Sequence, residues 1–341
     1  MIRPFARLLS ARLLVAAPIV LSLCTFEASA QQQIPPAPAP GEAVATPSAP
    51  APSEAPAFPP PDPANFTAAS PTKATIDGFL HAIWGSDEVR VWEIVAILKT
   101  PSEGVSKVSV LVSEKQPNAK IAQLDFYVLP DQKHIVVADQ SGLQMISFGE
   151  HPFAEARAEL LKRADGPFQG SPSKDLEIVE FADFQCPHCK AAQPNMEKIA
   201  TDFPKARIVF QNSPIVQLHP QATIAAEYGV CVAKLGGSTA FFQFASAVFD
   251  GQDGLSTPDG ATLTLNSSAT KVGLDPAKVA ECASKPETKA TVDASVKLAS
   301  DVGITSVPTI MVNGRPLSAT IPYADLKKLI EYQAKQDGAA Q

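Results

Sequence analysis

Two cysteines, Cys186 and Cys189, are separated by only two residues and follow an apolar run. The run from Leu176 to Phe181 is typical of a buried strand, and residues Pro187 to Phe203 carry a helical pattern. We therefore expect Cys186 at the N-terminus of a helix, where unpaired N–H groups and the positive end of the helix dipole stabilise a thiolate. Cysteines in that position have pKa values lowered from about 8.5 to about 3.5–7.5, so the sequence predicts a reactive thiol.

The residues Cys186-Pro187-His188-Cys189 also suit a disulfide that forms and breaks. Cys189 lies one helical turn after Cys186 on the same face, close enough to form a strained bond and to resolve a mixed disulfide. Pro187 fits the first turn because its missing N–H would be unpaired there, and His188 can donate a hydrogen bond or bring partial positive charge to the thiolate. A stabilised thiolate makes the disulfide a strong oxidant, so the pattern favours donating disulfides over reducing them.

Two other interpretations of the pair are a zinc site and an inert structural disulfide. Zinc sites commonly use two cysteines at this spacing, but the remaining ligands would have to be Cys231 and Cys282, or histidines such as His219. No second closely spaced cysteine pair exists, and a disulfide that closes a two-residue loop stabilises little. We therefore expect a redox pair with neither a metal nor a cofactor.

The region around the pair alternates strand and helix over about 167–336, which indicates an α/β fold with a sheet covered by helices. After the first strand and helix, Ala206 to Phe210 is a second strand. A long stretch from about Gln221 to Val302 is mostly helical, with a break at Gly236-Gly237. A strand at Thr309 to Val312 and a closing helix complete the pattern, so a helical block is inserted into a small α/β domain.

This domain resembles thioredoxin-fold proteins of the DsbA-like class over roughly Pro167 to Gln333. The resemblance rests on the redox motif preceded by Glu180-Phe181-Ala182-Asp183-Phe184, on the helical insertion, and on two later motifs, Ser306-Val307-Pro308-Thr309 and Asn313-Gly314. Together these features are far more specific than the cysteine spacing alone. The resemblance implies a thiol-disulfide oxidoreductase.

The resemblance also implies roles for three further residues. The bond between Val307 and Pro308 should be cis, with the loop against the two sulfurs and the Val307 backbone free to pair with an extended substrate. Glu180 should be a buried acid beneath the disulfide that relays a proton to or from Cys189, with a raised pKa. The alternatives are a trans proline that starts a strand and a Glu180 that faces solvent.

The other two cysteines of the exported chain, Cys231 and Cys282, form the second expected pair. Both fall within the helical insertion, as in members of the resembled class that carry a second disulfide. A structural bridge there would close a loop of about fifty residues and stabilise the fold by roughly 4 kcal/mol. A redox relay or free thiols are the alternatives.

The N-terminal part of the chain predicts export. Residues 1–30 have a basic start, a short apolar run and Ala28-Ser29-Ala30 as a cleavage site, which together are typical of a signal peptide. Residues 31–71 are rich in Pro and Ala and are expected to be a disordered linker. Residues 72–150 show alternating apolar positions typical of a small antiparallel α+β domain for orientation or dimerisation, and 151–166 a helical connector.

Charge and compartment limit the partners. Cleavage removes three arginines and one glutamate, so the formal net charge of −7 becomes −9, and binding to nucleic acid is not expected. The leading hypothesis is a periplasmic or otherwise extracytoplasmic oxidase that inserts disulfides into reduced exported polypeptides and is reoxidised by a membrane redox partner. The alternatives are a disulfide isomerase or reductase that is a homodimer through residues 72–150, and a non-catalytic holder that only binds peptides near Pro308.

Overall fold

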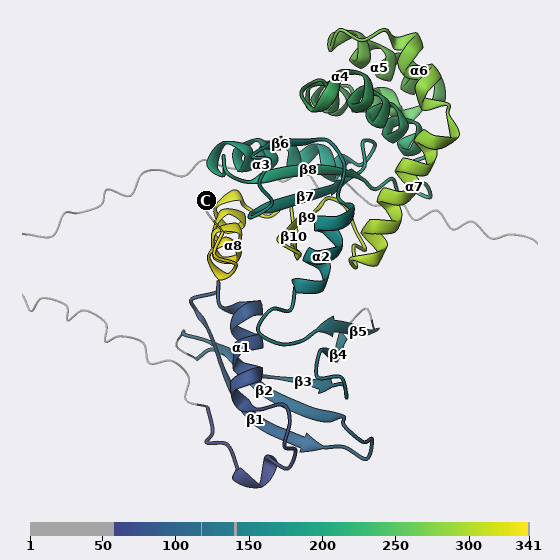
Figure 1. Ribbon diagram of the computed structural model, residues 1–341. Coiled ribbons are helices and arrows are strands. Elements are labelled where there is room, and N and C mark those ends of the chain that lie inside the picture. The colour runs from purple at the N-terminus through teal and green to yellow at the C-terminus, as the bar shows by residue number, and fades with distance from the viewer. Residues whose placement is uncertain (1–57, 117, 140–141, 340–341) are drawn as a thin grey trace, which may run out of the picture. The chain divides into compact units, whose positions relative to one another are not determined.

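The computed structural model describes residues 58–116, 118–139 and 142–339 (Figure 1). The predicted signal peptide and most of the predicted linker lie outside these residues. Within them the chain forms two five-stranded sheets, one in the N-terminal domain and one around the cysteine pair. The second sheet carries the helical insertion.

The N-terminal domain is an α+β unit with an antiparallel sheet in the order β1-β2-β3-β4-β5. Its elements are α1 (Lys73–Trp84), β1 (Arg90–Lys99), β2 (Ser106–Glu114), β3 (Ala122–Val128), β4 (His134–Asp139) and β5 (Gly142–Ser147). Thr72 caps α1 by accepting a hydrogen bond from Thr75 N–H. Ile76 and Phe79 on α1 pack against Val108 and Phe126 of the sheet, which buries one face of the sheet.

The predicted linker boundary at residue 71 is wrong, because ordered structure begins before it. A short 3₁₀ helix, η1 (Pro63–Asn65), is followed by Phe66, which bridges to Ile97 of β1 and packs on the core of the domain. Thr67 N–H and Ala68 N–H both donate to the carbonyl of Ile97. One aromatic side chain in this Pro-rich segment thus provides enough apolar surface to hold it on the sheet.

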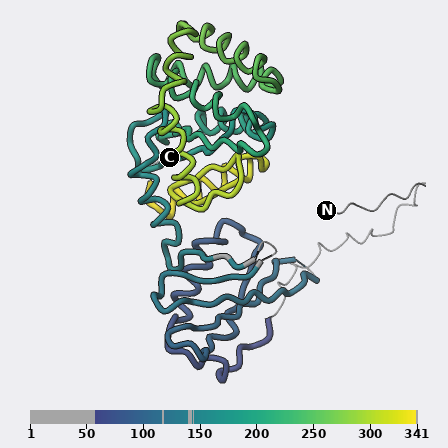
Figure 2. The backbone as a smooth tube through the Cα atoms, turned by 90° about the vertical axis from the view of Figure 1, so that its right-hand side faces the viewer, coloured from purple at the N-terminus to yellow at the C-terminus, as the bar shows by residue number. Residues whose placement is uncertain are grey.

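The second sheet has the order β10-β9-β7-β8-β6 and positions the cysteine pair. Its strands are β6 (Phe168–Gly170), β7 (Glu177–Ala182), β8 (Arg207–Asn212), β9 (Thr309–Val312) and β10 (Arg315–Ser318). β7 and β8 are parallel, whereas β9 runs antiparallel to β7. Figure 2 shows the yellow C-terminal segment returning beside the teal strands.

Alternate residues of β7 enter two separate cores, because successive side chains on a strand point to opposite faces. Ile178 packs with α3 (Pro187–Asp202) and α8 (Tyr323–Gln336), while Val179 packs with α2 (Ala154–Arg163) and α7 (Pro286–Asp301). Both faces of the sheet are covered, which explains why all six residues of β7 are buried. The predicted thioredoxin fold is confirmed.

The helical insertion connects β8 to β9 and contains α4 (Ala222–Asp250), η2 (Gln252–Ser256), α5 (Pro258–Lys271), α6 (Pro276–Ala283) and α7. α4 is kinked at Gly237, where φ is 77°, at the break predicted from the two glycines. The aromatic core of the insertion includes Phe241 and Phe244 and extends to Phe184 beside the cysteine pair. In the described part of the chain, no helix is both long and apolar enough to span a membrane.

Candidate active site

The strand-to-helix turn after β7 carries the two cysteines that are free thiols in the described part of the chain. Cys186 is the N-cap of α3 and Pro187 occupies the first turn, as the sequence predicts. Both thiols are free, and Cys186 is 4% exposed whereas Cys189 is completely buried. Pro187 and His188 are exposed between them. An incoming sulfur can therefore reach only the outer cysteine.

The two thiols differ sharply in acidity. The pKa of Cys186 is lowered to about 6, first because the Cys189 thiol donates a hydrogen bond to its sulfur, and then because the backbone N–H groups of Cys189 and His188 and the charge of His219 favour the thiolate. The same contact with Cys186, together with burial, raises the pKa of Cys189 well above its usual value of 9.0. Cys186 is thus a thiolate at neutral pH, and Cys189 keeps its proton.

Glu180 lies on β7 beneath the pair and is 3% exposed, so the solvent-facing alternative is excluded. Burial raises its pKa to about 7, while the hydrogen bond from Gln193 acts in the opposite direction. Gln193 Nε2 lies 3.0 Å from Glu180 Oε1 and 3.1 Å from the carbonyl oxygen of Cys189. A cavity of about 360 Å³, lined also by Lys190 and Phe249, reaches Glu180 and gives its carboxyl group a route to solvent.

The loop before β9 faces the outer sulfur. The peptide bond between Val307 and Pro308 is cis, and Cys186 Sγ lies 4.0 Å from the carbonyl oxygen of Val307. This contact places residues from opposite ends of the domain, 121 positions apart in sequence, at one site. The antiparallel pairing of β9 with β7 brings them together.

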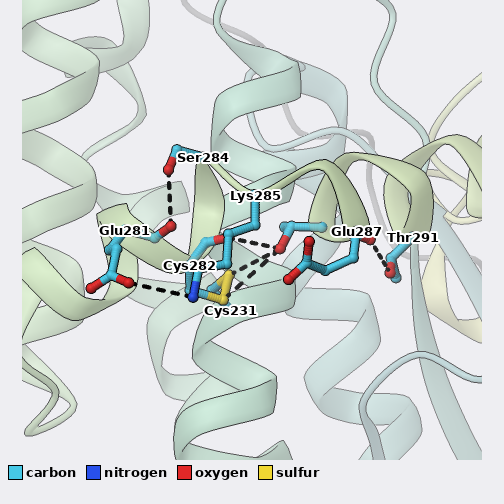
Figure 3. Close-up of a disulfide and its surroundings, with 8 residues drawn as sticks. Cys231, Glu281, Cys282, Ser284, Lys285, Glu287 and Thr291 are labelled. Atoms are coloured by element: carbon cyan, nitrogen blue, oxygen red, sulfur yellow. Dashed lines mark hydrogen bonds and ion pairs between the residues drawn. A yellow bond between two sulfur atoms is a disulfide. The ribbon is translucent and has the colours of Figure 1, made fainter.

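Cys231 and Cys282 form a disulfide in the helical insertion, between α4 and the end of α6 (Figure 3). Their Cα atoms are 5.8 Å apart, and the side chains are 0% and 7% exposed. Thr288 Oγ1 donates to the carbonyl oxygen of Cys282 at 2.8 Å. The bond therefore ties two helices together inside the core of the insertion.

The sequence alone assigns no redox role to several polar residues beside the cysteine pair. Asp183 is buried and hydrogen-bonded to His219, and Gln252 donates to two carbonyl groups of the active-site turn. From the sequence alone, His219 is only an alternative zinc ligand. Its position near the cysteine pair could be predicted from the sequence, because it follows a strand parallel to β7. The carboxyl ends of parallel strands meet at one edge of the sheet. The described residues contain no group of three or more His, Cys, Asp or Glu side chains that could hold a metal ion.

The profile of the family described as Thioredoxin matches residues 162–332. The chain belongs to the thioredoxin family. This membership agrees with the cysteine pair, the cis proline and the sheet order of the domain, and it identifies the protein as a thiol-disulfide oxidoreductase. The match begins in α2 and ends in α8, so the N-terminal domain lies outside it.

Solved structures and curated sequences resemble this thioredoxin-family protein over about half of its length. The catalytic domain of Proteus mirabilis ScsC is 19% identical with a TM-score of 0.46, covering 54% of this chain and 99% of that chain. A thioredoxin-like oxidoreductase from Silicibacter pomeroyi is 23% identical with a TM-score of 0.44, covering 54% of this chain and 99% of that chain. The Na(+)/H(+) antiporter NhaA 3 of Salinispora tropica is 29% identical over 147 residues, which are 43% of this chain and 21% of that protein. The chain thus spans about a fifth of the length of this curated relative.

Proposed function

We propose that this protein donates disulfides to reduced exported polypeptides through Cys186 and Cys189. The observation that carries the proposal is the difference between the two thiols: the pKa of Cys186 is lowered to about 6, whereas that of Cys189 is raised. A stable outer thiolate favours the reduced form of the pair. The disulfide form is then a strong oxidant, and it passes its bond on to a substrate.

The disulfide passes to the substrate in two thiol-disulfide exchange steps. A substrate thiolate attacks Cys186 Sγ, forms a mixed disulfide and breaks the bond to Cys189, whose sulfur takes up a proton. A second substrate thiolate then attacks the substrate sulfur of the mixed disulfide and releases Cys186 as a thiolate. The substrate loses two electrons and gains a disulfide, and the pair gains the two electrons.

Glu180 is the proposed source of the proton for Cys189. Its pKa of about 7 lets it exist in both protonation states near neutral pH, and the cavity that it lines allows exchange with solvent. His188 and Pro187 shape the exposed surface between the sulfurs. The backbone at Val307, held beside Cys186 by the loop with Pro308, is the proposed contact for an extended substrate chain.

The proposed setting is outside the cytoplasm. The three-part layout of residues 1–30, with cleavage near Ala30, supports export, and a buried disulfide between Cys231 and Cys282 suits an oxidising compartment. Regeneration of the disulfide requires an electron acceptor, for which we propose a membrane redox partner. The domain boundaries near residues 150 and 166 belong to the same proposal.

A homodimeric isomerase is the second candidate, and one feature of the N-terminal domain favours it. β5 is at the edge of its sheet, and Leu143 and Met145 on this strand are 77% and 68% exposed. An apolar edge strand is suited to pairing with another chain. An isomerase would need its cysteine pair kept reduced, whereas an oxidase needs it oxidised.

The reduction potential of the Cys186–Cys189 pair distinguishes the candidates. Mature protein is equilibrated with glutathione mixtures, and the fraction oxidised is measured by alkylation and mass. A potential near about −120 mV is expected for a disulfide donor, and one near about −270 mV would contradict this role. In the same mixtures, oxidised glutathione forms a mixed disulfide with Cys186 of the Cys189→Ser variant, and a thiolate of a reduced model polypeptide should displace glutathione and stay bound to Cys186, while Cys186→Ser should trap no polypeptide.

A further inference from the structure

Asp183 has a completely buried carboxylate directly after β7. Gln185 N–H donates to its Oδ1 at 2.7 Å, and Ile215 N–H donates to its Oδ2 at 2.8 Å. The third partner is His219, whose Nδ1 lies 2.8 Å from Oδ2. A carboxylate only accepts hydrogen bonds, so Nδ1 of His219 carries the hydrogen and Nε2 points away from Asp183.

The backbone of Asp183 contacts both redox cysteines. Its N–H donates to Cys189 Sγ at 3.4 Å, and its carbonyl oxygen accepts from Cys186 N–H at 3.1 Å. One residue therefore joins the two sulfur-bearing residues to His219. A side chain held by Asp183 is held in a fixed place relative to the reacting pair.

The loop that carries His219 is itself fixed at the carboxyl end of the sheet. Ser213 N–H donates to the carbonyl of Ala182 at 2.8 Å, which continues the pairing of β8 with β7 into the loop. His219 N–H donates to Ile215 at 2.9 Å, so the loop closes as a compact turn before α4. The His219 side chain is 15% exposed. The fold therefore holds the ring in place and leaves it partly accessible to solvent.

We propose that His219 is a positioning residue of the redox site, which Asp183 holds in place so that the charge of its imidazole ring stabilises the thiolate of Cys186. The inference rests on the proposed redox role of Cys186 and Cys189. It assigns to the Asp183–His219 pair a task that neither the cysteine motif nor the cis-proline loop performs. His219 acts on the outer sulfur through its charge and on the turn through Asp183.

The electrostatics around Cys186 agree with this assignment. Its pKa is lowered first by the Cys189 side chain, then by the backbone N–H groups of Cys189 and His188, and last by the charge of His219, while burial acts in the opposite direction. Glu180 acts on Cys189 instead, where its charge favours the protonated thiol. Among these groups His219 supplies the positive charge from a side chain outside α3.

A pair of variants separates the charge of His219 from its hydrogen bond. The amide nitrogen of Asn occupies nearly the place of Nδ1, so His219→Asn keeps the bond to Asp183 and removes the charge, whereas His219→Ala removes both. The thiolate of the reduced full-length protein is titrated by its ultraviolet absorbance and by its rate of alkylation. Both variants should hold about two- to threefold less thiolate than the wild type at pH 6.

The control is His151→Asn, the same change at an exposed histidine before α2. It should titrate like the wild type. The inference is overturned if His219→Asn also titrates like the wild type, because the ring would then serve only to anchor the loop. A wild-type pair that exchanges with no thiol at all would instead refute the proposed function, so the two failures are distinguishable.

Discussion

The two cysteine pairs of this chain lie in one domain and meet opposite physical conditions. Cys231 and Cys282 are joined across 51 positions inside the helical core. Cys186 and Cys189 are free thiols at a helix N-terminus, where one of them is stabilised as a thiolate. The first pair constrains a long stretch of chain, and the second constrains almost none.

The difference shows that surroundings, more than spacing, decide what a cysteine pair does. Cys231 is completely buried among the helices that the disulfide joins, and Cys282 is 7% exposed. At Cys186 the turn provides N–H groups and a neighbouring thiol that favour the leaving sulfur. Bond breaking is easy only where the product thiolate is stabilised.

Removal of the buried disulfide should have the largest effect on stability. Cys231→Ala with Cys282→Ala frees a loop of 51 residues in the unfolded chain and should lower the free energy of unfolding by about 4 kcal/mol. The reduction potential of the other pair should not change, because none of the groups that set the pKa of Cys186 is lost. Urea unfolding and glutathione titration measure the two quantities.

The matched control is the same double substitution at Cys186 and Cys189. It opens a two-residue loop only, so the free energy of unfolding of the oxidised protein should change much less. A larger loss of stability from this control than from the buried pair would reverse the comparison. A shifted potential in the Cys231 variant would show that the two pairs are coupled.

Substitution of Glu180 by Gln should change the pH dependence of stability. The pKa of Glu180 is about 7 in the folded protein, above the 4.5 of an ordinary glutamate, so the folded state holds its proton more tightly. Stability from this group is present below about pH 4.5 and is lost as pH rises through 7. Between pH 5 and pH 8 the wild type should lose about 2–3 kcal/mol relative to Glu180→Gln.

Urea unfolding of the reduced proteins at several pH values measures this difference. Titration of Cys186 contributes equally to the pH dependence of stability in both proteins, so its contribution cancels in the difference between them. The control Glu287→Gln replaces an exposed carboxyl group at the start of α7 and should follow the wild type at every pH. Parallel pH curves for Glu180→Gln and the wild type would mean that Glu180 is not held protonated by burial.

Much of the fold follows from local pattern, and the exceptions have physical causes. The strand Thr309 to Val312 has the predicted bounds, and α3 differs from its prediction by one residue. β1 shows no regular alternation of buried side chains, because a bulge falls between Ile94 and Ala96. β6 has three residues, too few to produce a pattern.

Some residues of the candidate site could be predicted from the sequence, and others could not. Cys186, Cys189 and the Val307–Pro308 loop were accessible because their residue types and spacing are informative by themselves. Asp183, His219 and Gln252 are ordinary residues whose importance depends on the folded chain, which joins β7, the loop after β8 and η2. The buried acid Glu180 is intermediate: the resemblance named it, and only the structure shows the cavity beside it.

The smallest predicted effect tests whether the helical insertion holds the reactive turn in place. Gln252 on η2 is 8% exposed, and its Nε2 donates to the carbonyl oxygens of Phe184 at 2.8 Å and Cys186 at 3.0 Å. Gln252→Leu keeps a similar volume and leaves these carbonyls without that donor. The free energy of unfolding should fall by about 1–2 kcal/mol.

The same variant should also change the reactive pair, unlike removal of the buried disulfide. The carbonyl of Cys186 accepts the first hydrogen bonds of α3, from Cys189 N–H and Lys190 N–H, so loss of its third donor loosens the turn that presents the outer sulfur. In Gln252→Leu, the rate of alkylation of Cys186 at fixed pH should therefore change as well as the free energy of unfolding. Gln243→Leu, at an exposed glutamine on α4, should change neither quantity. If Gln252→Leu lowers stability while the alkylation rate stays that of the wild type, the insertion supports the domain without positioning the turn, and the two cysteine pairs are independent.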